Sequence, residues 1–421
     1  MSVNEAYKKM ATSGLYAKPP GLKGKYDNVR RFWEDKITAY FLRPFLEEAK
    51  RNCLENGQKV RIMDLGCGSG DGYELLTEVV NHDASPQKVQ VNVLPEDEID
   101  LYVGVDLNSE LLEQGRGYFG NCDNVKFLKG DFIQGLGVED EPPFDIYLAN
   151  YGTLSHCTDE EVEQLLVRII NHGGKRTLFM GDWLGAYSYE WQNWWANPLE
   201  KNYSMPYVVS YLYEEEERPN AELESFDMRL MDRPTLFNII NRVSEKTGVE
   251  IKVLRVFDRS TFVGRHIETG DYLDHPQKIR TAVNSLLEPE CRTNLEEVKV
   301  SFQPREGFPW INEHFKRLEQ CWNGLVDIAE NILAGEYDYI NLDGEIGEGV
   351  EEHTKDIDEF LSISAKTLTH LMRQSRDLPV EDIRANIIEP QLAYLLRRAE
   401  MVFQEGLGMG HGFTAILEIN R

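Results

Sequence analysis

The part of the chain best suited to bind a ligand runs from Asp64 to Gly70 and reads Asp-Leu-Gly-Cys-Gly-Ser-Gly. It follows a short apolar run that predicts a strand and precedes a stretch that predicts a helix. Glycines at alternate positions allow a sharp turn and a close backbone approach to a ligand, because no Cβ stands in the way. The segment therefore predicts a ligand-binding loop rather than a simple turn.

The residues around this loop indicate the kind of ligand. A dinucleotide fingerprint needs glycine at the sixth position of G-x-G-x-x-G, and counting from Gly66 that position is Asp71. Carboxylates before and after the loop would repel a pyrophosphate, whereas they suit the ammonium and sulfonium of S-adenosylmethionine. The pattern disfavours a dinucleotide and favours the methyl donor.

This loop resembles the first motif of class I S-adenosylmethionine-dependent methyltransferases, and three further motifs follow in that family's order. Asp106, at the end of the second predicted strand, stands where the family has an acidic residue that binds both ribose hydroxyls. Gly130-Asp131-Phe132 resembles the adenine contact, and the fourth strand ends at Asn150, where the family lines the methyl-transfer site. The resemblance implies that the donor is held by the following residues: Asp64, Gly66, Cys67, Gly68, Gly70, Asp106, Leu107, Asp131, Phe132 and Asn150.

Two side chains after the fourth predicted strand are candidates for proton transfer from the acceptor. His156 is the first candidate for a catalytic base, since a neutral imidazole accepts a proton near neutral pH. An equally weighted alternative is that His156 caps a helix or orders its loop. Tyr151 is a second catalytic candidate, as an orienting hydroxyl more than as a base.

Short apolar runs separated by polar segments predict the strands of the core. They lie at residues 60–63, 101–105, 125–128, 146–149 and 177–180. Predicted helices between them, at about 72–81, 109–118 and 159–171, give the alternation of a doubly wound, mainly parallel sheet. With the resemblance, this predicts an α/β fold built on a seven-stranded, Rossmann-like methyltransferase core.

The predicted core spans residues 58–269 and follows an N-terminal arm and cap helix at 1–57, of which the arm is expected to be poorly ordered. Within the core, an aromatic-rich insertion at about 183–233 predicts a lid. The core is expected to end in two strands, at 251–257 and 261–266.

Residues 270–421 predict a mainly helical accessory domain with a terminal strand. Apolar residues recur at three- and four-residue intervals over about 309–334, 350–376 and 379–405, which predicts a helix bundle. The alternating end of the chain, 412–419, predicts a strand, but the sequence does not indicate which sheet it joins.

The acceptor is expected between the loop from Asn150 to His156 and the aromatic segment from Trp183 to Trp195, because ligands of open α/β sheets bind beyond the carboxyl ends of strands. The aromatic residues with a possible pocket-lining role are Trp183, Tyr187, Tyr189 and Trp191, together with Glu190. A hydrophobic lid packed on the sheet is the other interpretation.

A formal net charge of −27 argues against nucleic acid and anionic membranes as partners. The six cysteines form no C-x-x-C pair, and no metal-ligand spacing occurs, so neither a metal site nor a disulfide framework is predicted. No apolar run has the length of a membrane span, and a cytoplasmic location is expected. The oligomeric state is not indicated.

Three functions remain open from the sequence, of which the third is the transfer of another group from a related nucleoside donor. The first is a methyltransferase acting on a small-molecule acceptor, in the manner of specialised metabolism. The second is a catalytically silent, methyltransferase-like module whose helical domain binds a protein partner. The complete glycine loop and Asp106 favour the first.

Overall fold

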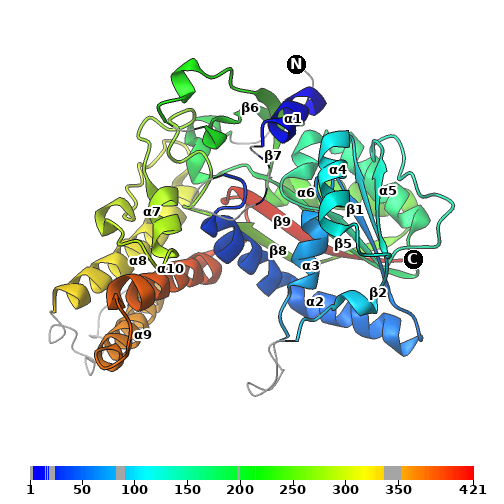
Figure 1. The fold of residues 1–421 in the computed structure, drawn as a ribbon. Coiled ribbons are helices and arrows are strands. Elements are labelled where there is room, and N and C mark those ends of the chain that lie inside the picture. Colours follow the sequence, from blue (N-terminus) through cyan, green and yellow to red (C-terminus); the bar gives the residue numbers. More distant parts are fainter. Residues whose placement is uncertain are drawn as a thin grey trace.

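The computed structural model describes residues 3–14, 16, 18, 24–81, 91–196, 200–213, 215–335 and 352–421. In this part of the chain a mixed sheet occupies the centre, with helices on both faces and a group of long helices extending to one side (Figure 1). The strands are β1 (Val60–Leu65), β2 (Ile99–Asp106), β3 (Val125–Lys129), β4 (Ile146–Ala149), β5 (Arg176–Gly185), β6 (Ser204–Val208), β7 (Ser225–Met231), β8 (Glu250–Arg259) and β9 (Gly412–Asn420).

The predicted seven-stranded core is present, in the spatial order β3-β2-β1-β4-β5-β9-β8. Strands β1 to β5 are parallel, and β9 is antiparallel to both of its neighbours, β5 and β8. The β6–β7 hairpin joins the sheet where β7 pairs with the end of β5. The terminal strand, whose partner the sequence left open, is therefore an internal strand of the core sheet.

The strand expected over residues 261–266 does not form. Strand β8 ends at Arg259, and its partner in the sheet is β9, which pairs with it from Glu250 to Arg259. The apolar residues beyond β8 are buried against the helical region instead: the ring of Phe262 lies 5.5 Å from that of Trp322. A buried irregular segment is as rich in apolar residues as a buried strand, so the sequence pattern could not distinguish the two.

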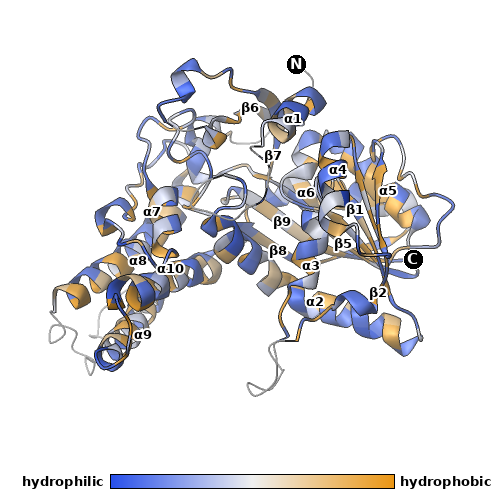
Figure 2. Ribbon diagram, viewed as in Figure 1, coloured by the Kyte–Doolittle hydropathy of each residue, from blue (hydrophilic) through white to orange (hydrophobic). Residues whose placement is uncertain are grey.

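Helices cover both faces of the sheet because neighbouring residues of its strands point to opposite sides. On β1, Ile62 belongs to the hydrophobic cluster under α2 (Asp35–Glu55), α3 (Asp71–Thr77) and α4 (Ser109–Phe119). Met63 belongs to the cluster under α5 (Asp159–His172) and α6 (Arg233–Thr247). Figure 2 shows the apolar strands between these helices. The result is a three-layer α/β core.

The helical region lies between β8 and β9 in the chain. It contains α7 (Ile279–Leu286), α8 (Pro309–Ala334), α9 (Glu352–Ser375) and α10 (Glu389–Phe403), the last preceded by a π-helical turn, Arg384–Ile388. Helices α8, α9 and α10 match the three predicted stretches, and α7 was not predicted. Pro390 stands in the first turn of α10, where a missing N–H is tolerated.

The helical region shares a hydrophobic cluster with the start of the chain. Trp33 lies 5.7 Å from Trp322 of α8, ring centre to ring centre, and its Nε1 donates to Glu400 of α10 at 2.8 Å. Both indoles are fully buried. The helices thus pack against the N-terminal segment as well as against one another.

The N-terminal arm, expected to be poorly ordered, contains a packed helix, α1 (Val3–Thr12), which contacts α4. Ala6 and Met10 bury its apolar face, so the arm gains order from a tertiary contact. A π-helical turn, Arg30–Glu34, leads into α2. Pro44 lies inside α2, which continues through it.

Short 3-10 turns connect several elements: Glu96–Glu98, Thr153–His156, Tyr189–Trp194, Ser210–Leu212, Arg218–Asn220 and Leu295–Glu297. The insertion expected between residues 81 and 99 begins with a bridge between Val80 and Asn92, and its middle lies outside the described residues. Among the described helices, none is long and apolar enough to cross a membrane.

Because β9 is internal to the sheet, its side chains should carry much of the core's stability. Leu417 on β9 is fully buried, so Leu417→Ala should lower the free energy of unfolding by about 2–5 kcal/mol. Urea unfolding followed by circular dichroism measures the change. Leu378→Ala, at a half-exposed leucine, is the matched control and should change stability by less than about 0.5 kcal/mol. Equal losses in the two variants would contradict a structural role for β9.

Candidate functional site

The loop after β1 has the backbone that its glycines predict. Gly66, Gly68 and Gly70 all have positive φ angles, 68°, 54° and 94°, in the left-handed region that side chains with a Cβ rarely adopt. A Cβ at Gly66 would also lie 2.5 Å from the methyl group of Thr153. The loop therefore lies close to the turn after β4, and the N–H groups of Gly66 and Cys67 donate to the carbonyl of Val105 on β2.

The carboxylate at the end of β2 fixes this loop. Asp106 accepts the N–H of Gly68 at 2.9 Å and that of Asn108 at 2.8 Å. Burial raises the pKa of Asp106, and these backbone donors oppose the rise. After the next strand of the chain, β3, Asp131 accepts the N–H of Ile133 at 2.9 Å. Each predicted carboxylate thus stands where a parallel strand ends.

These residues surround one cavity of about 350 Å³, within the size range of small-molecule sites. The predicted donor-binding residues that line it are Gly66, Cys67, Gly68, Asp106, Leu107, Asp131, Phe132 and Asn150. The amide of Asn150 is buried, and neither its oxygen nor its nitrogen has a hydrogen-bond partner within the protein. A buried amide without partners is costly, so a polar ligand in this cavity would satisfy it.

The charge of the cavity favours a cation. Its lining includes four carboxylates and a single lysine: Asp71, Asp106, Asp131, Glu161 and Lys25. A larger groove, of about 740 Å³, lies beside Arg61 and Arg176, where the strands begin. Since ligands of open α/β sheets bind at the carboxyl ends of strands, the acidic cavity is the stronger candidate.

Two of the predicted donor-binding residues do not line the cavity. Gly70 shapes the turn into α3 and faces Phe119. Asp64 points back into the core, where it accepts the hydroxyl of Tyr102 at 2.6 Å. Burial raises the pKa of Asp64 to about 7, although the bond from Tyr102 opposes the rise. Their part in holding the loop is therefore structural.

The N-terminal segment closes one side of the cavity, a role that the sequence did not indicate. Tyr7 of α1 lines it, and Lys25 forms an ion pair with Asp71 at 2.9 Å. Tyr26 donates to the same carboxylate at 2.7 Å. These bonds tie the arm to the first turn of α3, so the arm covers the cavity as a lid would.

His156 lies in the 3-10 turn after β4 and lines the cavity. Its Nε2 is 3.2 Å from the hydroxyl of Tyr7, and its ring packs against Tyr7 and Phe226. Burial lowers the pKa of His156 to about 4, so the ring is neutral at pH 7. Its catalytic role stays a prediction.

Tyr151, the second catalytic candidate, has a strained backbone with φ of 57°. Its ring lies under the guanidinium of Arg30, 3.4 Å from ring centre to Cζ, and its hydroxyl donates to Asp35 at 3.1 Å. Burial raises the pKa of Tyr151 well above its usual value, and Arg30 opposes the rise. The phenol stays protonated at neutral pH, which fits an orienting group rather than a base.

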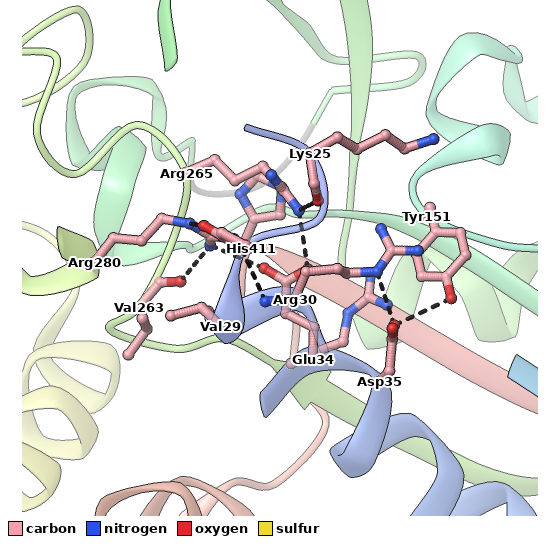
Figure 3. A network of polar contacts seen from close by, with 12 residues as sticks. Lys25, Val29, Arg30, Glu34, Asp35, Tyr151, Val263, Arg265, Arg280 and His411 are labelled. Atoms are coloured by element: carbon pink, nitrogen blue, oxygen red, sulfur yellow. Dashed lines mark hydrogen bonds and ion pairs between the residues drawn. The ribbon is translucent and has the colours of Figure 1, made fainter. Parts of the chain in front are cut away.

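A second cavity, of about 70 Å³, adjoins the first and shares some of its walls. The residues that line both are Tyr7, Tyr16, Lys25 and Tyr151. The loop after β4 and the end of β5 share a wall here, as expected, through Tyr151 and Trp183. Figure 3 shows several of the side chains that line this cavity, among them Arg30, Arg265 and His411.

The aromatic residues between Tyr187 and Trp195 do not line either cavity. Tyr189 and Trp195 pack against Phe315 of α8, with ring centres 5.9 and 5.7 Å apart, and Tyr187 contacts Phe308. Trp191 donates its indole N–H to the carbonyl of Gly185 at 2.8 Å. This part of the segment is an interface between the sheet and the helical region.

Sequence reasoning missed the residues that the N-terminal segment and the chain end bring to the site. Lys25 and Arg30 stand in a stretch without a motif, so no signal marks them. His411 lies in Gly406-Leu407-Gly408-Met409-Gly410-His411-Gly412, whose alternating glycines resemble a tight loop and could have drawn attention. Among the described residues, no group of His, Cys, Asp and Glu side chains is placed to hold a metal.

The mixed sheet with helices on both faces and a ligand-sized cavity at the carboxyl ends of its strands matches the Rossmann-like core of methyltransferases. The fold is the mainly parallel, Rossmann-like α/β fold that the sequence predicts. No protein-family model matches the sequence, and no curated protein matches it.

Solved structures with a similar architecture include several methyltransferases. A S-adenosylmethionine-dependent methyltransferase from Clostridium acetobutylicum ATCC 824 is 14% identical, with 60% of this chain and 90% of that chain covered and a TM-score of 0.34. DhpI in the DhpI-SAM-HEP complex is 12% identical, with 60% and 93% covered and a TM-score of 0.32. The N-terminal domain of EvdMO1, in the presence of SAH and D-fucose, is 18% identical, with 61% and 91% covered and a TM-score of 0.32.

The buried carboxyl of Asp64 should make stability depend on pH. Its folded-state pKa of about 7 lies above the usual 3.8, so its contribution is present at low pH and is lost as the pH rises from about 4 to 7. Asp64→Asn has no carboxyl to ionise at this position and so avoids the loss. As the pH rises through that window, the free energy of unfolding of the variant should therefore increase relative to that of the original protein by on the order of 2–4 kcal/mol. Urea unfolding at pH 5 and pH 8 measures the difference.

Two features keep this comparison clean. Glu400, whose pKa burial also raises to about 7, is unchanged in both proteins and cancels. Asp97→Asn, at an exposed carboxylate, should leave the pH dependence of stability unaltered. A constant stability difference between Asp64→Asn and the original protein from pH 5 to 8 would show that Asp64 does not titrate in this window.

Proposed function

We propose that this protein is an S-adenosylmethionine-dependent methyltransferase that acts on a small-molecule acceptor. The observation that carries the proposal is the acidic cavity at the carboxyl ends of the strands, where Asp106 holds the glycine loop and the unpartnered amide of Asn150 faces the interior. The likeness of the sequence motifs to the family points the same way.

The residues present fit such a donor. Asp106 would bind the ribose hydroxyls, because its two carboxylate oxygens match a vicinal diol. Asp131 would accept the adenine amine, with Phe132 against the ring. Cys67 and Gly68 would face the amino acid part, and Asn150 would gain the polar partners that the protein does not supply. When bound, the donor supplies a methyl group already activated by its sulfonium.

The acceptor would occupy the second cavity, which opens from the first along Tyr7, Tyr16, Lys25 and Tyr151. The tight enclosure by α1 and the β6–β7 hairpin favours a small molecule over a polymer. The protein would act mainly by holding the acceptor in line and excluding water. His156 stays our sequence-based candidate for the base, and all six cysteines are free, which is in keeping with a reducing, cytoplasmic setting.

Removing the carboxylate of Asp106 tests donor binding. Asp106→Ala should weaken the binding of S-adenosylhomocysteine by about 1.5–3 kcal/mol, the usual range for a hydrogen bond to a charged group. Isothermal calorimetry measures the affinity. Asp123→Ala, at an exposed carboxylate, is the control and should bind as the original protein does.

Two results would count against the proposal. Unchanged affinity in Asp106→Ala would place the ribose elsewhere. No binding of S-adenosylhomocysteine or S-adenosylmethionine to the original protein would leave the cavity to another ligand and favour a catalytically silent module.

A further inference from the structure

A carboxylate and an imidazole form a buried pair beside the second cavity. Nδ1 of His411 lies 2.5 Å from a carboxylate oxygen of Glu190, whose side chain is fully buried. Burial raises the pKa of Glu190, but the nearby imidazoles of His411 and His266 outweigh this and lower it overall. The carboxylate is therefore ionised and accepts the proton of Nδ1, which fixes the ring in one tautomer.

The backbone around His411 is held firmly. Asp258 on β8 accepts the N–H groups of four successive residues at 2.8–3.2 Å. These residues are Leu407, Gly408, Met409 and Gly410. The N–H of His411 itself donates to the carbonyl of Ser260 at 3.1 Å. The imidazole thus stands on a fixed loop at the start of β9.

Close packing accounts for the glycines of this loop. A Cβ at Gly185 would lie 2.3 Å from the carbonyl oxygen of Gly410, and one at Gly412 would lie 2.7 Å from a guanidinium nitrogen of Arg259. Only bare backbone lets the loop approach the ends of β5 and β8 this closely. The approach brings His411 to the wall of the second cavity.

His411 lines the second cavity together with Tyr151 and Trp183. Because Nδ1 is bonded to Glu190, Nε2 is the nitrogen available to a molecule in the cavity. Glu190 follows β5 in the chain, whereas His411 precedes β9. The two residues meet only because β5 and β9 pair in the folded sheet.

The walls of this cavity suit a flat ring. Seven aromatic side chains among the described residues line it: Tyr7, Tyr16, Tyr151, Trp183, Tyr207, Tyr211 and Phe226. At about 70 Å³ the cavity is smaller than the roughly 150 Å³ space that admits benzene, so an aromatic molecule needs some movement of the arm that carries Tyr7.

We propose that His411, held by Glu190, is the catalytic base for an aryl hydroxyl acceptor bound in this second cavity; the proposal rests on the methyltransferase function. The O–H bond of the acceptor breaks and its proton goes to Nε2 of His411. The electron pair stays on the oxygen and forms the bond to the methyl carbon, while the carbon–sulfur bond of the donor breaks with its electrons going to sulfur. Glu190 is a positioning residue that stabilises the imidazolium.

This assignment competes with His156. The ring of His156 lies among Tyr7 and Phe226, and burial lowers its pKa to about 4, which makes it a weak base. It lacks a carboxylate partner on Nδ1, which is buried without a hydrogen bond. His411 has such a partner in Glu190, and a catalytic base is commonly oriented by a third group in this way.

The first experiment needs no turnover. The protein, saturated with S-adenosylhomocysteine, is titrated with a panel of nitrophenols, whose ionisation is visible by absorbance, while long-range ¹⁵N spectra report the histidine rings. We expect His411 to carry its proton on Nδ1 in the free protein and on both nitrogens when a nitrophenolate is bound. His411→Gln should weaken nitrophenolate binding at least 10-fold.

Other results of this titration would overturn the proposal. They are a proton on Nε2 alone in the free protein, equal nitrophenolate binding in His411→Gln, or no nitrophenol binding at all. Each of these is distinct from failure of the methyltransferase function, which would appear as loss of S-adenosylhomocysteine binding in the original protein.

The second experiment measures transfer of labelled methyl groups to whichever phenol of the panel binds best. His411→Gln should lower kcat/KM about 100-fold or more, as the loss of a general base does, with donor affinity unchanged. His156→Ala should have a much smaller effect. His275→Gln, at an exposed histidine, is the control and should retain full activity. A larger loss in His156→Ala than in His411→Gln would return the role to His156.

Glu190→Gln tests the positioning role through the pH profile. The charged groups and imidazoles that face His411 or share its cavity are Glu190, His266, Lys25, Arg30, Arg259, Arg265 and Glu34. Without the charge of Glu190, an imidazolium at His411 loses the carboxylate that stabilises it, so the acidic limb of the kcat/KM profile should move to lower pH. An unmoved limb, in a variant whose circular dichroism is native, would show that Glu190 acts on the fold alone.

Discussion

The structure depends on one buried carboxylate in the middle of the sheet. Asp182 on β5 accepts a guanidinium N–H of Arg259 at 2.6 Å and the hydroxyl of Thr414 at 3.0 Å, which joins β5 to both β8 and β9. It also accepts the N–H of Gly152 at 3.0 Å, in the loop that carries Tyr151. A buried pair stripped of one partner costs about 3–5 kcal/mol, so this carboxylate couples sheet assembly to the geometry of the site.

A second charged network joins the start of the chain to the helical region. Arg280 of α7 forms two bonds of 2.8 Å with Asp27 and one of 2.9 Å with Glu34. Burial raises the pKa of Glu34, but Arg265 and Arg280 outweigh it and hold the pKa well below its usual value. The arginines and Glu34 lie together in Figure 3. The helical region therefore helps to hold the N-terminal segment that covers the cavity at the carboxyl ends of the strands.

The core could be predicted from sequence because its signals are local. The glycine loop and the carboxylates Asp106 and Asp131 each stand directly after an apolar strand, so their position follows from strand order. The contribution of Lys25 and the partner of β9 depend on contacts between distant segments, which periodicity does not encode. The strand predicted over residues 261–266 was wrong for the same reason. Its apolar residues, such as Phe262, pack against the helical region and not within a sheet.

The same limit applies to the catalytic candidates. Position after the fourth strand pointed to His156, whereas the pairing of His411 with Glu190 spans 221 residues. Such a pair leaves no pattern in the sequence except the glycines that let the loop approach the sheet. Donor-site prediction thus rests on motifs, and acceptor-site prediction needs the fold.

The position of β9 has a consequence for how the chain reaches its native state. Arg176 of β5 pairs with Asn420, so the central pairing of the sheet joins residues more than 200 positions apart. Folding rates fall as contacts become less local, because loop closure must precede the contacts that reward it. Until β9 arrives, β5 and β8 each present an unpaired edge, and such edges invite pairing with other chains. We therefore expect slow refolding that becomes less efficient as the protein concentration rises, with intermediates that aggregate through this gap in the sheet.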